Sequence, residues 1–202
     1  MIKLTAAEFA EIVSGEPCNL DPNEIIDQTP VINSKEAKDG NFFAAFVGEN
    51  LDGHLYVKDA IANGAKFALV SKRVTEPSIL VADVGAALLK LTTYVRTHIK
   101  DLKLIGITGS QGKTTTKEYL NSILSLVGET VATQGNLNTD IGVPLTVLRC
   151  TNETKFCIVE MGARHMGDIA KLTIATRPDV GVVLVVGTAH LGEFGSVENI
   201  AK

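Results

Sequence analysis

The sequence predicts an α/β protein in which a small N-terminal α/β domain is followed by a mostly parallel α/β domain that opens with a glycine-rich loop. Strands and amphipathic helices alternate along the chain, which is typical of this class. An apolar strand runs directly into the loop and a helix at residues 103–116. Residues 180–186 are apolar throughout, as expected for a parallel strand covered on both faces.

The N-terminal half begins with a helix-start signal. Thr5 and Glu8 form a capping box, so we expect a helix from there to about Gly15. Clusters of β-branched and aromatic residues predict strands, and apolar residues spaced three or four apart predict helices. These patterns predict strands near Ile25 and at 41–47, 67–70 and 79–81, and helices at 57–62 and 84–99.

The second half restarts the alternation near Lys100, so we predict one domain at 1–100 and another at 101–202. The same patterns predict a strand from about Lys103 and further strands at 130–133, 155–160 and 180–186, with helices at 113–126, from about Ile141, and at 167–174. In such sheets, ligands bind beyond the carboxyl ends of the strands.

Composition limits the partners of this chain. Hydrophobic residues make up 45% and charged residues 21%, as in folded globular proteins. The net charge is −4 and neither half is basic, which argues against a nucleic-acid partner. No apolar run has membrane-spanning length, so we expect no membrane insertion. Cys18, Cys150 and Cys157 lack metal-ligand spacing and indicate reduced thiols in a cytoplasmic protein.

The loop between the strand and the helix is the main candidate site. Glycines allow backbone N–H groups to turn toward phosphate oxygens, and the following helix directs its positive end there. Lys113 would reach the β- and γ-phosphates, and the Thr114 hydroxyl would bind Mg²⁺. Ile107 stands where the general pattern has a glycine, and the alternative is a glycine-rich turn with an accidental lysine. The predicted nucleotide-binding residues here are Gly109, Ser110, Gln111, Gly112, Lys113, Thr114 and Thr115.

Other candidates follow neighbouring strands. Glu160 ends the strand at 155–160, so its carboxylate belongs at the ligand-binding edge, where Mg²⁺ would need such an oxygen. His190 follows the strand at 180–186 and would ligate a second metal or contact the γ-phosphate. An ordinary loop glutamate and a loop histidine without such a role remain the alternatives. Asn136 and Asn138 are turn formers by composition.

Eight segments carry a family resemblance. They are residues 33–35, 40–48, 52–54, 60–65, 109–117, 135–144, 159–163 (with His165 and Gly167) and 189–196. Through these segments the chain resembles the Mur ligases over essentially all 202 residues. It is most similar to the members that act in peptidoglycan precursor synthesis by joining D-Ala-D-Ala to UDP-MurNAc-tripeptide.

The resemblance implies an ATP- and Mg²⁺-dependent amide ligase that works through an acyl phosphate. Lys113 matches the lysine on the ATP phosphates, Thr114 and Glu160 match ligands of one Mg²⁺, and His190 matches a ligand of the other. The catalytic set is therefore predicted to be Lys113, Glu160 and His190. Asn136 and Asn138 match a segment that borders the ATP site.

The same resemblance assigns residues 1–100 to UDP-MurNAc-peptide binding, with substrate contacts from Ser34, Lys35 and His54. It assigns residues 101–202 to the first part of a central ATP-binding domain, truncated here, with a C-terminal domain beyond residue 202. We therefore expect the 202 residues alone to be inactive, and the enzyme to be a monomer.

The chain also departs from the family pattern. Arg164 stands where the family usually has asparagine, and Asn33-Ser34-Lys35 replaces the usual Asp-Ser/Thr-Arg. Two alternatives stay open. One is a P-loop nucleotide-binding module, a kinase or switch, with an N-terminal interaction domain. The other is a Mur-type ligase with a different amino acceptor, or a folate- or cyanophycin-type relative.

Overall fold

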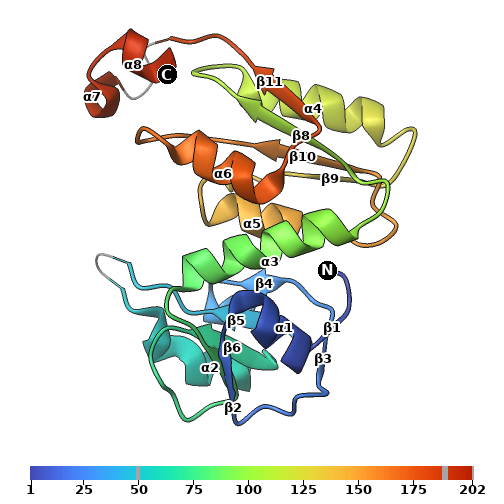
Figure 1. Ribbon diagram of the computed structural model, residues 1–202, viewed down its shortest axis with the longest axis vertical. Coiled ribbons are helices and arrows are strands. Elements are labelled where there is room, and N and C mark those ends of the chain that lie inside the picture. The colour runs from blue at the N-terminus through green and yellow to red at the C-terminus, as the bar shows by residue number, and fades with distance from the viewer. Residues whose placement is uncertain (49–50, 188–190, 202) are drawn as a thin grey trace. The chain divides into compact units, whose positions relative to one another are not determined.

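The computed structural model describes residues 1–48, 51–187 and 191–201 (Figure 1). It divides into two compact units, Met1–Tyr94 and Val95–Lys202, with the division falling inside one helix, α3 (Val84–His98). Each unit combines a sheet with helices, which confirms the predicted α/β class. Within the described ranges, no helix combines the length and apolarity needed to cross a membrane.

The N-terminal unit contains a five-stranded sheet in the order β2-β7-β6-β5-β4. Its strands pair in parallel, except that β2 is antiparallel to β7. The strands are β2 (Glu16–Cys18), β4 (Pro30–Val31), β5 (Phe42–Ala44), β6 (Phe67–Val70) and β7 (Ser78–Leu80), with β1 (Leu4–Thr5) and β3 (Ile25–Ile26) forming a separate pair. The helices are α1 (Ala6–Val13) and α2 (Val57–Ala62). Two short 3-10 turns, η1 (Ser34–Glu36) and η2 (Gly53–Tyr56), lie between strands or before α2.

Three phenylalanines form part of the core of this unit. The ring of Phe9 on α1 meets Phe42 and Phe67 edge-on, with centroids 5.1 and 5.3 Å away, and all three are fully buried. The predicted capping box is confirmed: Thr5 and Glu8 bind each other's backbone N–H groups. Ser14 then ends the helix in the left-handed conformation. The capping box thus starts α1, and the Phe9 contacts pack this helix against β5 and β6.

The C-terminal unit contains a four-stranded parallel sheet in the order β11-β8-β10-β9. The strands are β8 (Lys103–Thr108), β9 (Thr130–Ala132), β10 (Phe156–Glu160) and β11 (Val180–Val183); the helices are α4 (Lys113–Leu124), α5 (Gly142–Val147), α6 (Asp168–Thr176), α7 (Leu191–Phe194) and α8 (Val197–Ala201). Helix α4 packs on β8, β9 and β10. In this register Glu160 lies opposite Ile107 of β8, next to the start of the loop.

One expectation about this sheet was wrong. Strand β11 ends at Val183 instead of Val186, and among the described residues it pairs only with β8, at the sheet edge. Val183 is 72% exposed, so the strand is not covered on both faces. Apolar composition indicates that a strand can be buried, but it does not supply the element that buries it.

The three cysteines are free, as predicted. Cys150 and Cys157 are buried in the C-terminal unit, and Cys18 is half-buried. A hydrogen bond with Cys150, together with burial, raises the pKa of the Cys157 thiol well above its ordinary value. These two thiols are therefore part of the core.

Candidate functional site

The loop from β8 to α4 has the backbone geometry that its glycines predict. Gly109 (φ +138°) and Gly112 (φ +83°) both adopt positive φ angles, which disfavour side chains. A Cβ atom on Gly109 would lie only 2.8 Å from Cβ of Leu184. Gly112 is the N-cap of α4 and offers no side chain to cap it, so the first N–H groups of the helix are available for an anion.

The segment after β11 closes one side of the loop. The N–H of Ser110 donates to the C=O of Val185 at 2.9 Å, and the N–H of Gly187 donates to the Ser110 hydroxyl at 2.9 Å. Lys113 Nζ donates to the C=O of Gly109 at 2.6 Å, within the loop itself. The Lys113 ammonium group therefore already lies at the loop, where it could exchange its bond to Gly109 for one to a bound phosphate.

The end of β10 supplies the carboxylate. Thr114 Oγ1 donates to Glu160 Oε2 at 2.9 Å, and Asn138 Nδ2 donates to Glu160 Oε1 at 2.9 Å. Glu160 is only 4% exposed. The N–H of Gly162 donates to the C=O of Asn138 at 2.7 Å, which holds the asparagine segment against the strand end. Asn136 lies in the same turn, where its C=O accepts from the N–H of Asn138.

The donor atoms at this point suit a hard cation. A carboxylate and a hydroxyl are oxygen ligands of the kind that Mg²⁺ prefers, usually together with water and substrate phosphates. No cluster of three or more His, Cys, Asp or Glu residues that could hold a metal occurs among the described residues. An ion held by Thr114 and Glu160 would complete its coordination with water and phosphate oxygens. His190, the predicted second metal ligand, lies outside the described residues.

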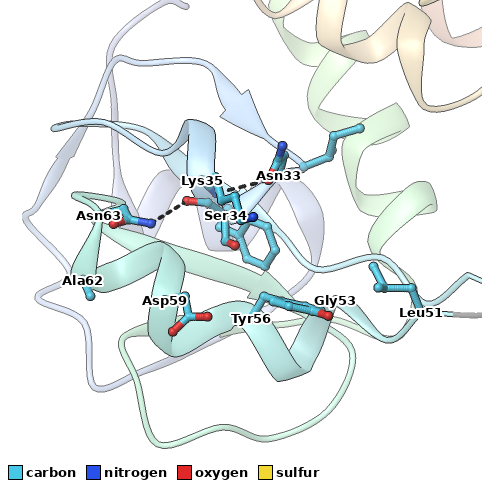
Figure 2. A pocket seen from close by; sticks show the side chains of 11 residues that line it. Asn33, Ser34, Lys35, Leu51, Gly53, Tyr56, Asp59, Ala62 and Asn63 are labelled. Carbon is cyan, nitrogen blue, oxygen red and sulfur yellow. Dashed lines mark hydrogen bonds between the residues drawn. The ribbon is translucent and has the colours of Figure 1, made fainter.

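The N-terminal unit contains a separate cavity of about 620 Å³ (Figure 2). The η1 turn contributes Ser34 and Lys35, two of the predicted substrate-binding residues, and η2 and α2 contribute Tyr56 and Asp59. Asn63 Nδ2 donates to the C=O of Ser34 at 3.0 Å and so joins α2 to η1. Sequence reasoning missed Tyr56 and Asp59, although both follow closely after the 52–54 segment.

His54, the third predicted substrate-binding residue, does not line this cavity. Its Nδ1 lies 2.6 Å from Asp52 Oδ1, and its Nε2 accepts from the N–H groups of Ser71 and Lys72 at 3.0 and 3.2 Å. Both ring nitrogens thus have protein partners and tie η2 to the segment after β6. A substrate contact by His54 stays a prediction. Hydrogen bonds from the Lys72 side chain, and from the backbone and ring of His54, hold the pKa of Asp52 well below its ordinary value.

The parallel sheet, the glycine loop opening α4 and the carboxylate at the next strand end define the P-loop class of α/β proteins. Comparison with known proteins identifies the family within this class: the model of the Mur ligase middle domain matches residues 107–202. The chain belongs to the Mur ligase family.

Curated relatives align with the whole chain. It is 41% identical, over an alignment of 229 positions, to UDP-N-acetylmuramoyl-tripeptide--D-alanyl-D-alanine ligase of Mycobacterium bovis. It is 37% identical over 204 residues to the Escherichia coli protein of the same name. These alignments cover 100% of this chain but only 45% and 44% of the relatives, so the chain spans about half their length.

Solved structures show the same relationship. A crystal structure of MurF from Acinetobacter baumannii matches with a TM-score of 0.91 and 38% identity, over 98% of this chain and 44% of that one. MurF ligase from Thermotoga maritima, in complex with ADP, matches with a TM-score of 0.77 and 37% identity, over 87% and 42%.

Proposed function

We propose that this chain is part of an ATP-dependent ligase that adds D-Ala-D-Ala to UDP-MurNAc-tripeptide. The observation that carries the proposal is the match of the whole chain to relatives of that name. The contact between Thr114 and Glu160 at the loop supports it independently, because it supplies the donor atoms that a metal–nucleotide complex requires. The enzyme is proposed to act on small molecules in the cytoplasm, as a monomer and without a nucleic-acid partner.

The two units are assigned different substrates. Residues 1–100 would bind the UDP-sugar peptide, with the cavity beside Ser34 and Lys35 as its nucleotide-binding part. Residues 101–202 would bind ATP through the loop at 109–115, with Asn136 and Asn138 at the border of the site. A relative from Thermotoga maritima was solved in complex with ADP, which supports adenine-nucleotide use by the family.

The first step of the reaction brings together two negatively charged groups, the tripeptide carboxylate and the ATP triphosphate. An oxygen of the tripeptide carboxylate attacks the γ-phosphorus, ADP leaves, and an acyl phosphate forms. The amine of D-Ala-D-Ala then attacks the acyl carbon, the bond to phosphate breaks, and the amine loses a proton. Lys113 and the helix N-terminus would hold the phosphates in place. Thr114 and Glu160 would hold Mg²⁺, which lowers the repulsion and stabilises charge on the transferred group.

A chimera tests the proposal. The 202 residues would replace the aligned 44% of the Escherichia coli relative, and phosphate release would be measured with ATP, UDP-MurNAc-tripeptide and D-Ala-D-Ala. We expect release only when all three are present, and none after Lys113→Met. The isolated 202-residue chain is expected to show no turnover.

The alternative of a nucleotide switch makes a different prediction. A switch hydrolyses or exchanges nucleotide without an amine, so its phosphate release would not respond to D-Ala-D-Ala. Release that continues unchanged without the dipeptide would contradict the ligase and favour the switch.

A further inference from the structure

A buried lysine lies beneath the loop. Lys117 follows Lys113 by one turn of α4, and only 3% of its surface is exposed. Its Nζ donates to the C=O of Thr133 at 2.9 Å and pairs with the Glu118 carboxylate at 2.7 Å. Burying an ammonium group is costly, and the Glu118 side chain that pairs with it is 59% exposed, so the pair contributes little net stability. Lys117 therefore needs an explanation other than stability.

Thr133 lies where the ladder between β9 and β10 ends. Its N–H still donates to the C=O of Ile158 at 3.0 Å, as in a parallel pair. If that pattern continued, the N–H of Glu160 would donate to the C=O of Thr133. Instead the N–H of Glu160 donates to the Thr133 hydroxyl at 3.0 Å, while the C=O of Thr133 accepts from Lys117.

These hydrogen bonds form a network that links Glu160 to α4 through both its backbone and its side chain. Its backbone is held by Thr133, which is held by Lys117 on α4. Its side chain is held by Thr114, three residues earlier on the same helix. Lys117 and Thr133 are both almost fully buried, so water does not compete for these bonds. One helix thus fixes the glutamate from two sides.

We propose that Lys117 and Thr133 are positioning residues that set the Glu160 carboxylate for Mg²⁺ at the loop. The inference rests on the proposed function, because it takes Glu160 to be a magnesium ligand. Groups behind a metal ligand orient it, and their loss typically lowers metal affinity by about 10–100-fold. Lys117 and Thr133 would act in this way without touching metal or nucleotide.

The test is a titration of ADP into the 202-residue chain, with Mg²⁺ and with EDTA. The ratio of the two Kd values gives the enhancement by Mg²⁺. Lys117→Met and Thr133→Val should lower this enhancement by about tenfold or more and leave the affinity in EDTA unchanged. Thr133→Ser, which keeps the hydroxyl, should restore it. Lys103→Met, the same substitution on an exposed lysine at the start of β8, should have no effect.

Three results would overturn the inference. If Mg²⁺ enhances ADP affinity fully in both Lys117→Met and Thr133→Val, the positioning role is overturned and the proposed function stays intact. Equal loss of affinity with and without Mg²⁺ would mean that the two residues hold the loop and not Glu160. Failure of the unsubstituted chain to bind ADP would overturn it together with nucleotide binding. Thermal unfolding checks that each variant folds, and if Lys117→Met does not, the Thr133→Val and Thr133→Ser pair decides.

Discussion

The hydroxyl of Thr114 donates to Glu160 across 2.9 Å, although the two residues lie 46 positions apart in the chain. Thr114 is at the start of α4, and Glu160 is the last residue of β10. Because β8 and β10 are parallel neighbours, the helix that follows one strand begins beside the end of the other. This pair brings oxygen donors to the mouth of a loop whose backbone is shaped for phosphate.

Removing either oxygen donor should weaken magnesium-dependent nucleotide binding. Glu160→Gln and Thr114→Val keep the shape of each side chain but remove the charge or the hydroxyl. We expect the Mg²⁺ enhancement of ADP affinity to fall by at least about tenfold in each variant, because a ligand should matter no less than the groups that orient it. Glu153→Gln, on an exposed glutamate in the same unit, serves as the control. An undiminished enhancement in Glu160→Gln would exclude Glu160 as a metal ligand.

Gly109→Ala should damage the loop. The added Cβ would lie 2.8 Å from Leu184 Cβ, at a φ of +138° that side chains rarely adopt. Such strain costs about 1–3 kcal/mol, so we expect a lower Tm and a weaker affinity for ADP. Gly181→Ala on β11 is the matched control, because nothing lies within 4 Å of its added Cβ. Equal Tm values and ADP affinities for the two variants would contradict the observed loop conformation.

The cavity in the N-terminal unit should depend on Lys35. A lysine that contacts a phosphate contributes about 1.5–3 kcal/mol, so Lys35→Met should weaken the binding of UDP by about tenfold or more. Binding of uridine, which lacks phosphate, should change little. Lys38→Met, a neighbouring exposed lysine that does not line the cavity, should leave both affinities unchanged. A UDP affinity that survives Lys35→Met would remove this residue from the substrate site.

Asp52 should stabilise the η2 region in a pH-dependent way. The pKa of its carboxyl is lowered in the folded protein, chiefly by the Lys72 hydrogen bond, so the unfolded chain takes up a proton first as pH falls. The stabilisation is therefore complete above about pH 4, the ordinary pKa of aspartate, and is lost below it. Asp52→Asn should lower the Tm at pH 7, and the difference from the unsubstituted protein should shrink in acid. A difference that is constant with pH, or equal to that of the exposed Asp39→Asn, would exclude this role.

Much of the site follows from local signals in the sequence. The glycines, Lys113 and the apolar strand before them predict the loop, and the end of the next buried strand predicts the position of Glu160. Sheet topology then requires these groups to meet, because the carboxyl ends of parallel strands share one edge. The capping box at Thr5 is likewise a signal confined to four residues.

Other features depend on contacts that no local pattern records. Lys117 has the appearance of a surface lysine in sequence, and its burial follows from the packing of α4 over β9. The bond between Asn138 and Glu160 depends on how a turn folds back over a strand end. The cavity that includes Tyr56 and Asp59 depends on the packing of α2 against the two short turns η1 and η2. The exposure of Val183 depends on the position of β11 at the edge of the sheet, which its own apolar sequence does not predict.

The most direct test of nucleotide binding at the loop follows the amide NMR signals of the chain as ADP and Mg²⁺ are added, because this method detects weak binding residue by residue. We predict saturable shifts at Gly109, Gly112, Lys113 and Thr114 and at Glu160, with those at Glu160 appearing only when Mg²⁺ is present. Saturable shifts confined to other residues, or no saturable shift at the loop, would contradict the proposal that these groups bind a metal–nucleotide complex.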